Sequence, residues 1–218
     1  MFRSALVTGG ASGIGAATVA LLEAEGCDVQ SLDLATGFDV ADAEAWASVG
    51  AVDFAFLNAG VATGANEIAD LPDEAYRRAV GANVDGVVFG VRRMAQVMEP
   101  GSAIVATASL AGLMAMPLDP IYSLTKHAIV GLVRAVAPQL AARGITINAL
   151  CPSFADTPIV GDELREWVTG QGWSLIPPET VAQAALAAAR SGETGQAWVV
   201  QIGREPMVYE FRGVPGPR

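Results

Sequence analysis

The sequence predicts an α/β fold in which a doubly wound parallel sheet carries helices on both faces, as a single domain. Three observations support this prediction. Short apolar runs alternate along the chain with segments of helical periodicity. A cluster of glycines lies between the first apolar run and the first helical segment. Polar residues follow several of the apolar runs, at the edge where ligands of open parallel sheets bind.

Composition narrows the class of protein. The chain has 218 residues, 52% of them hydrophobic, which suffices for a domain with a full core. Its net charge of −10 disfavours a nucleic-acid or anionic membrane partner. The N-terminus enters a strand without a signal-peptide layout, and no apolar run reaches membrane-spanning length. We therefore expect a cytoplasmic protein. Cys27 and Cys151 lie in interior segments without metal-ligand spacing, so we expect core residues and no metal site.

A strand over residues 3–8 leads into the glycine turn, residues 9–15, and then into a helix that ends near residue 25. This order aims backbone N–H groups and a helix N-terminus at a phosphate. The next strand ends at Asp33, whose carboxylate can accept hydrogen bonds from an adenosine ribose and repels a 2′-phosphate. This favours NAD over NADP. A solvated aspartate at a strand end is the alternative.

The chain between Asp33 and Asp39 is unusually short. Residues 34–38 are too few for a helix and a return strand. We therefore expect a sheet that is shortened between the second and fourth strands, and a more open adenine pocket. A short helix is predicted over residues 41–48, with Ala45, Trp46 and Val49 turned inward.

The middle of the chain places further polar residues after strands. A strand over residues 53–57 is followed by Asn58, and a loop covers residues 61–72. A long helical region then runs to about Met98, with Asn83 in its middle. Asparagine is a mediocre helix former that often bonds backbone groups. The alternative is an exposed polar position.

The strand over residues 103–108 leads to Ser109, and a helix follows over residues 120–142. Tyr122 and Lys126 are four residues apart, so they share one face of that helix. An ammonium beside a phenol favours the phenolate, so we expect a lowered pKa for Tyr122. Ser109 could hydrogen-bond the same substrate oxygen. Such a site can interconvert an alcohol and a carbonyl if a cofactor exchanges a hydride.

The remaining chain continues the alternation, with a strand over 145–150, a loop over 151–158, a helical flap over 161–175, a helix over 177–190 and a strand over 197–202. Trp167 and Trp173 in the flap either cap the substrate or pack the flap itself. We expect one domain over residues 1–203, which includes the flap region 154–176, and a C-terminal tail over residues 204–218.

Four motifs occur in a familiar order: Thr8-Gly9-x-x-x-Gly13-x-Gly15, Asn58-Ala59-Gly60, Asn83, and Ser109 followed by Tyr122-x-x-x-Lys126. From the first strand to about residue 203 the sequence resembles the short-chain dehydrogenase/reductase family. The segments that begin at Ser109, Tyr122 and Asn148 are similar to hydroxyprostaglandin-dehydrogenase-like members. The resemblance implies a Rossmann-type fold and a homodimer or homotetramer.

The resemblance also implies a role for each matched residue. Tyr122 is the general acid/base, Lys126 binds the nicotinamide ribose and lowers the tyrosine pKa, Ser109 orients the substrate oxygen, and Asn83 holds a water. The implied cofactor contacts are Gly9, Ser12, Gly13, Ile14, Gly15, Asp33, Asp39, Val40, Asn58, Ala59, Gly60, Tyr122, Lys126, Pro152 and Thr157. Ser153 departs from the Pro-Gly that is usual in the family, which affects the backbone near the nicotinamide.

The sequence thus predicts an NAD-dependent oxidoreductase that interconverts an apolar secondary alcohol and a ketone. Candidate substrate contacts are Leu110, Met116, Phe154 and Trp167. A loop that only packs on the core accounts equally well for Met116 and its neighbours. One alternative function is a non-catalytic dinucleotide-binding redox sensor, which needs the glycine turn but not Ser109, Tyr122 and Lys126. Another is epimerase, dehydratase or double-bond chemistry on the same fold.

Overall fold

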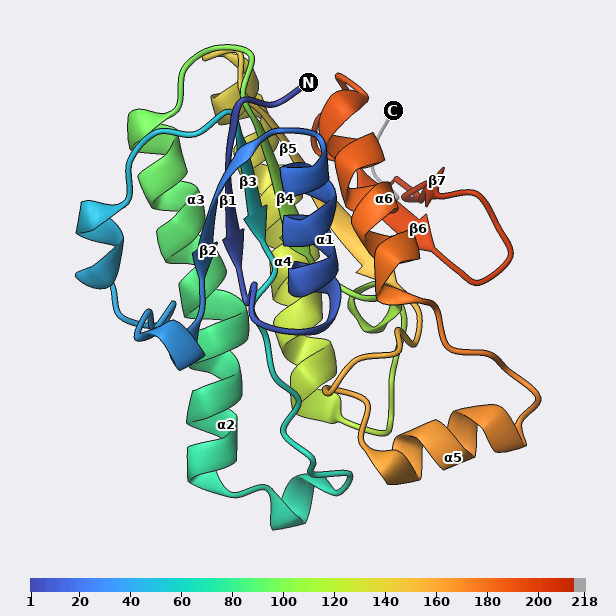
Figure 1. Cartoon of the computed structure of the whole chain (residues 1–218). Helices are drawn as coiled ribbons and strands as arrows, with labels where there is room; N and C mark the ends of the chain where they lie inside the picture. Colours follow the sequence, from blue (N-terminus) through green and yellow to red (C-terminus); the bar gives the residue numbers. More distant parts are fainter. Residues whose placement is uncertain (214–218) are drawn as a thin grey trace.

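One mixed sheet organises the computed structural model, which describes residues 1–213 (Figure 1). Within this range seven strands follow the order β2-β1-β3-β4-β5-β6-β7. The first six strands are parallel, and β7 pairs antiparallel with β6. The strands are β1 (Ser4–Thr8), β2 (Asp28–Leu32), β3 (Phe54–Leu57), β4 (Ala103–Thr107), β5 (Thr146–Pro152), β6 (Ala197–Val200) and β7 (Met207–Val208). The predicted α/β fold is confirmed.

Helices cover both faces of this sheet (Figure 1). On one face lie α1 (Gly13–Ala24) and α6 (Pro178–Arg190), and on the other lie α3 (Gly86–Val97) and α4 (Pro120–Ala141). Strand side chains alternate between two cores: Leu6 joins the α3/α4 core, whereas Ala5 and Val7 join the α1/α6 core. This is the period of two that a strand imposes.

Two helices lie toward the carboxyl ends of the strands (Figure 1). The first, α2 (Asp73–Val80), continues into α3 through a π-helical turn, Gly81–Asp85. The predicted long helical region is therefore present but interrupted. The second, α5 (Asp162–Gly170), forms only part of the predicted flap helix over residues 161–175.

The sheet is shortened where the sequence predicts it. A single 3-10 turn, Leu34–Thr36, follows β2 and is capped by Asp33, whose Oδ1 accepts from Ala35 N at 2.9 Å. No strand of the described chain lies beyond β2, so β2 forms the edge. The predicted helix over 41–48 is wrong: only a 3-10 turn, Ala45–Ser48, forms, and Ala45 is partly exposed. Asp39 and Asp42 cap the backbone two residues ahead, which competes with helix formation.

Trp46 fills the space beside this short connection. Its ring is buried and packs edge-on against Phe38 at 5.3 Å between centroids. Its Nε1 donates to Val40 O at 3.0 Å. A Cβ on Gly90 of α3 would lie 2.9 Å from the Trp46 ring, so α3 can approach closely only because this residue is glycine. Val49 is buried beside it, as predicted.

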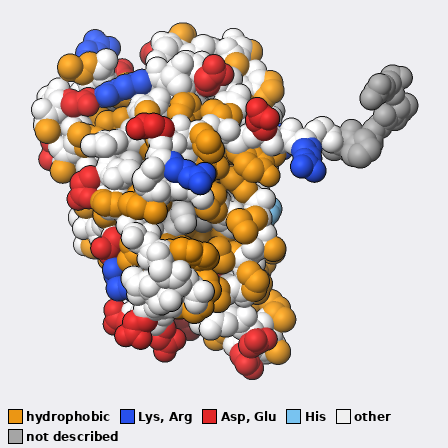
Figure 2. Space-filling view, turned by 90° about the vertical axis from the view of Figure 1, so that its right-hand side faces the viewer, with side chains coloured by type: hydrophobic (Ala, Val, Ile, Leu, Met, Phe, Trp, Pro, Cys, Tyr) orange, Lys and Arg blue, Asp and Glu red, His pale blue; other side chains and the backbone are white. Residues whose placement is uncertain are grey.

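The residues after β6 add to the sheet. β7 lies on a face where exposed hydrophobic side chains gather, among them those of Met207, Val208 and Tyr209 (Figure 2). Phe211 packs against the α3/α4 core, and the Arg134 guanidinium lies 3.8 Å from its ring centroid. The predicted tail, 204–218, extends beyond the described residues from 214 onward. Both cysteines are free and buried. Among the described helices none has the length and apolar character needed to cross a membrane.

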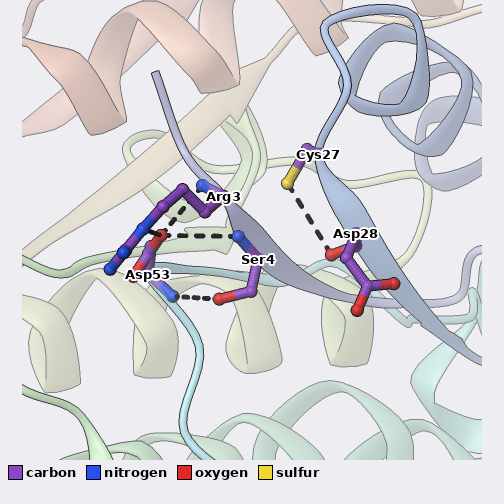
Figure 3. A network of polar contacts seen from close by, with 5 residues as sticks. All are labelled: Arg3, Ser4, Cys27, Asp28 and Asp53. Atoms are coloured by element: carbon purple, nitrogen blue, oxygen red, sulfur yellow. Dashed lines mark hydrogen bonds and ion pairs between the residues drawn. The ribbon is translucent and has the colours of Figure 1, made fainter.

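At the opposite end from the polar strand ends, Asp53 joins β1 to β3 (Figure 3). Its Oδ2 accepts from Arg3 N at 2.8 Å and Ser4 N at 3.4 Å, and its own N–H donates to Ser4 Oγ at 3.2 Å. The hydrogen bond from the Arg3 backbone is the main reason that the pKa of Asp53 lies below its usual value.

Replacing Trp46 with Ala should lower the free energy of unfolding by about 3–5 kcal/mol, because it empties a fully enclosed aromatic site. Chemical denaturation measures this loss. Trp46→Phe keeps an aromatic ring and should cost less, and Trp173→Ala, at an exposed position, serves as the matched control. A loss below about 1 kcal/mol would show that the connection does not depend on this side chain.

Asp53→Asn should lower stability at pH 7 and flatten its dependence on acid. Because the folded-state pKa is depressed, the ionised carboxylate stabilises the fold above the unfolded-state pKa of about 4. That contribution disappears as the pH falls through the folded-state pKa. Urea midpoints between pH 7 and pH 2.5 measure the change, with Asp28→Asn as the exposed control (Figure 3). Parallel pH curves for wild type and Asp53→Asn would contradict the assignment.

Candidate active site

The carboxyl ends of β4 and β5 and the first turns of α4 bring Ser109, Tyr122 and Lys126 together. Ser109 follows β4 and caps the 3-10 turn Leu110–Gly112, where its Oγ accepts from Ala111 N at 3.1 Å. The same hydroxyl donates to Pro152 O, at the end of β5, at 3.4 Å. The side chain of Ser109 lies close enough to Tyr122 to lower the pKa of its phenol. Two hydroxyl groups are therefore placed where they can address one substrate oxygen.

Lys126 is buried, with 2% of its surface exposed. Its Nζ donates to Thr107 O on β4 at 2.8 Å and lies 5.4 Å from the centroid of the Tyr122 ring. A Cβ on Gly60 would lie 3.4 Å from Nζ, so the end of β3 also borders this ammonium. Burial lowers the pKa of Lys126 to about 8.

The expectation that Lys126 lowers the pKa of Tyr122 is wrong for this arrangement. Burial raises the pKa of Tyr122 to about 12, and the charges of Asp119 and Cys151 act in the same direction, whereas the hydrogen bond with Ser109 lowers it. The ammonium lies 5.4 Å from the centroid of the Tyr122 ring and donates to Thr107 O, and Lys126 is not among the groups that shift the pKa of Tyr122. Desolvation is then the larger effect.

Asn83 lies in the π-helical turn and is fully buried, so the alternative of an exposed position is wrong. Its Oδ1 accepts from Val61 N at 2.8 Å, and its Nδ2 donates to Val61 O at 2.9 Å and to Thr125 Oγ1 at 3.0 Å. Two of the three partners are backbone groups, as one interpretation expected, but they belong to Val61 in a distant loop, and the third is the side-chain hydroxyl of Thr125 on α4. Asn83 therefore fastens the loop after β3 to the helix that carries Tyr122.

The glycine turn forms a cradle that only glycine permits. Gly13 has φ +52°, and a Cβ on it would lie 3.0 Å from Thr157 Cγ2. A Cβ on Gly15 would lie 2.0 Å from Gly9 O. The side chain of Ser12 does not cap α1, so within the described residues its hydroxyl accepts no hydrogen bond from the first N–H groups of this helix. This cradle fits a dinucleotide pyrophosphate. Ile14 is partly buried next to it.

Of the residues expected at the adenosine, Asp33 contacts the glycine turn directly. Asp33 Oδ2 accepts from Ala11 N, within the turn, at 3.0 Å. Asp39 is exposed and its Oδ1 accepts from Ala41 N at 2.9 Å, whereas Val40 is buried. Both ends of the expected adenine site are therefore present, although the strand between them is missing.

Two threonines, whose contribution the sequence analysis did not identify, link the cradle to Lys126. Thr8 Oγ1 accepts from Asn58 N at 2.9 Å and from Ala59 N at 3.1 Å. Thr107 Oγ1 donates to Asn58 Oδ1 at 3.1 Å, while its carbonyl holds Lys126. The available signal was a threonine at the last position of two apolar runs.

A third missed residue, Asp119, precedes Pro120, which is a typical helix start.

The four candidate substrate residues lie in two segments around Ser109. Leu110 and Met116 are partly buried in the segment that follows it. Phe154 is partly buried, and its ring centroid lies 6.3 Å from that of Trp167 and 6.5 Å from that of Trp173. The two tryptophans are 5.7 Å apart and more than 40% exposed, so the flap carries an aromatic cluster open to solvent.

Backbone hydrogen bonds join the two ends of the flap next to the candidate site. Ile176 N donates to Phe154 O at 2.8 Å, and Asp156 N donates to Ile176 O at 2.9 Å. Ser153, the departure from Pro-Gly, donates its N–H to Val200 O at 2.9 Å and so extends the pairing of β5 with β6. Pro152 and Thr157 are both buried at this base.

Comparison with known proteins defines the class. Residues 38–204 match a family model described as enoyl-(acyl carrier protein) reductase. The chain is 36% identical over 153 residues to a 3beta-hydroxysteroid dehydrogenase of Mediterraneibacter gnavus; the match covers 66% of this chain and 54% of that protein. It is 33% identical over 216 residues to a cis-4-hydroxycyclohexanecarboxylate dehydrogenase of Sinomonas cyclohexanicum, covering 84% and 87%.

A solved structure supports the same class. A short-chain dehydrogenase from Burkholderia cenocepacia, in complex with NADP, superposes with a TM-score of 0.79 at 25% identity, over 90% of this chain and 95% of that one. The chain therefore belongs to the short-chain dehydrogenase/reductase family, a family of oxidoreductases. Its structural relatives bind nicotinamide dinucleotides, which agrees with the cradle described above.

Asn83→Ala should destabilise the fold by about 1–3 kcal/mol, because Val61 and Thr125 lose buried hydrogen-bond partners. Thermal and chemical unfolding measure the loss. Asn66→Ala, at an exposed asparagine, is the matched control. If both variants unfold alike, the buried amide does not fasten the loop to α4.

Proposed function

We propose that this chain is an NAD(H)-dependent dehydrogenase/reductase that interconverts an apolar secondary alcohol and its ketone. The observation that carries the proposal is the placement of the Ser109 hydroxyl and the Tyr122 phenol next to the buried Lys126. Two hydroxyls aimed at one place suit a substrate oxygen that changes between hydroxyl and carbonyl. Two relatives are named for hydroxysteroid and hydroxycyclohexanecarboxylate oxidation, which agrees with this reaction class.

In this mechanism Tyr122 exchanges a proton with the substrate oxygen, and Ser109 donates a hydrogen bond to the same oxygen. The nicotinamide, when bound, accepts or supplies the hydride. With a pKa near 12 the phenol of Tyr122 is protonated at neutral pH, ready to protonate a ketone oxygen. The ammonium of Lys126 has a pKa near 8 and is held by Thr107 O, from where it can bind ribose hydroxyls. Asn83 is assigned the water-holding role that the family motif implies.

The preference for NAD over NADP rests on Asp33. Its carboxylate lies at the end of β2, one oxygen held by the glycine turn, where it would repel a 2′-phosphate. We assign the pyrophosphate to the cradle, the adenosine to Asp33, Asp39 and Val40, and the nicotinamide side to Pro152 and Thr157. Asn58, Ala59 and Gly60 border the cofactor between them.

An apolar substrate is supported by the aromatic cluster. Phe154 follows Pro152, whose carbonyl accepts from Ser109, so the cluster begins beside the candidate site. We assign substrate contacts to Leu110, Met116, Phe154 and Trp167. We further propose that residues 1–203 act as one domain in a cytoplasmic homo-oligomer, for which the apolar face near β7 offers a contact surface (Figure 2).

The test is absorbance of reduced nicotinamide with NAD and with NADP, across aliphatic, aromatic, cyclic and steroidal secondary alcohols. Turnover should require NAD, and Tyr122→Phe should lower kcat/KM at least about 100-fold because the proton donor is lost. Tyr76→Phe, at an exposed tyrosine of α2, is the matched control and should retain full activity.

Other results would point elsewhere. Equal rates for wild type and Tyr122→Phe would remove the proposed role of Tyr122. Preference for NADP would overturn the assignment of Asp33. Tight NAD binding without turnover would favour the redox sensor, and reduction of a conjugated double bond, but no alcohol oxidation, would favour the enoyl reductase chemistry for which the matching family model is described.

A further inference from the structure

Asp119 is a buried carboxylate that the proposed reaction does not use. It immediately precedes α4, and 9% of its surface is exposed. Its Oδ1 accepts from Tyr122 N at 2.8 Å. Its Oδ2 accepts from Thr63 N at 2.7 Å and from Gly64 N at 3.4 Å. Within the described chain, all these donors are backbone N–H groups.

These contacts join two walls of the candidate site. The first turn of α4 carries Tyr122. The loop on the other side continues from Gly60, which borders Lys126, and is fastened at Val61 by Asn83. Asp119 adds a second fastening two residues later, at Thr63. The loop is thus held at one end by the π-helical turn and at the other by the start of α4.

Only a carboxylate can make both connections. An asparagine has one acceptor oxygen, so it could serve Tyr122 N or Thr63 N but would present an NH₂ group to the other. A serine hydroxyl can cap α4 but is too short to reach the loop as well. An aspartate at this position therefore does more than start a helix.

We propose that Asp119 is a positioning residue for the proposed reaction: one oxygen fixes the first turn of α4 beneath Tyr122, and the other holds the loop after Gly60 against it. The inference rests on the proposed function for its kinetic part only. The groups that shift the pKa of the phenol are Ser109, Asp119 and Cys151, and the ammonium of Lys126 lies 5.4 Å from its ring centroid. Since the charge of Asp119 raises the pKa of Tyr122, its removal should move the Tyr122-dependent limb of the pH profile to lower pH.

The experiment compares wild type with Asp119→Asn and Asp119→Ser by hydrogen–deuterium exchange and by the pH dependence of kcat/KM. In Asp119→Ser the amides of Thr63 and Gly64 should exchange at least about tenfold faster, because the carboxylate oxygen that accepts from both is lost. In Asp119→Asn the single acceptor oxygen can serve either Tyr122 N or the loop, so faster exchange is expected on one of the two sides. The midpoint of the pH limb should move to lower pH, because the negative charge that raises the pKa of Tyr122 is lost. Asp73→Asn, at an exposed acidic residue in the first turn of α2, is the matched control and should change neither quantity.

Unchanged exchange at Thr63 and Gly64 in folded Asp119→Ser would overturn the proposal, as would faster exchange with an unchanged pH midpoint, kcat and KM. Asp119→Ser keeps a helix cap and so provides a folded variant if Asp119→Asn does not fold. Exchange is measured without turnover. If wild type oxidises no alcohol, the proposed function fails, while faster exchange in the variants would still support the fastening of the loop.

Discussion

The buried ammonium of Lys126 constrains the rest of this structure. A charged group removed from water is costly unless hydrogen bonds replace its solvation. Here the backbone carbonyl at the end of β4 accepts a hydrogen bond from the ammonium in place of water. This contact requires that β3, β4 and α4 meet within a few ångströms. The same burial brings the pKa of the amine toward neutrality, so small changes around it alter its charge within the physiological range.

Residues that never contact a substrate maintain this meeting point. Thr107 makes two of the contacts: its backbone carbonyl accepts a hydrogen bond from Lys126, and its hydroxyl donates one to Asn58. Asn58 in turn lies beside Thr8, which precedes the glycine turn. A continuous chain of hydrogen bonds therefore runs along the carboxyl edge of the sheet, from the cradle of β1 to the ammonium at β4. Asn83 and Asp119 brace the loop above it. The glycine turn and Lys126 thus belong to one polar network.

Much of this was predictable because local signals agree with the fold. The apolar runs of β1, β3, β4 and β5 are buried on both faces, which makes them read as continuous hydrophobic segments. The shortened edge followed from chain length alone. The helix over residues 41–48 failed because Asx turns at Asp39 and Asp42 compete with it, an effect that periodicity does not register.

For the candidate site, too, the sequence predicted some features and could not predict others. Spacing in the sequence could bring Tyr122 and Lys126 onto one face of α4, yet it could not show that the ammonium donates to the carbonyl of Thr107 and lies 5.4 Å from the ring centroid. The direction of the Tyr122 pKa depends on this arrangement and on burial, which are tertiary properties. Thr8 and Asp119 bind backbone N–H groups that lie 50 and 56 residues away in the sequence, and no local pattern marks such partners.

The position of β2 has a consequence for how this chain can vary. Its outer edge is the only side of the described parallel strands on which another strand could be added without breaking an existing pair. The turn over Leu34–Thr36 lies at that edge, and its side chains are exposed. Extra sequence inserted there would enlarge the sheet outward and leave the register of every other strand unchanged. This loop is therefore an insertion position, where added segments could be accommodated while the core and the glycine turn stay intact.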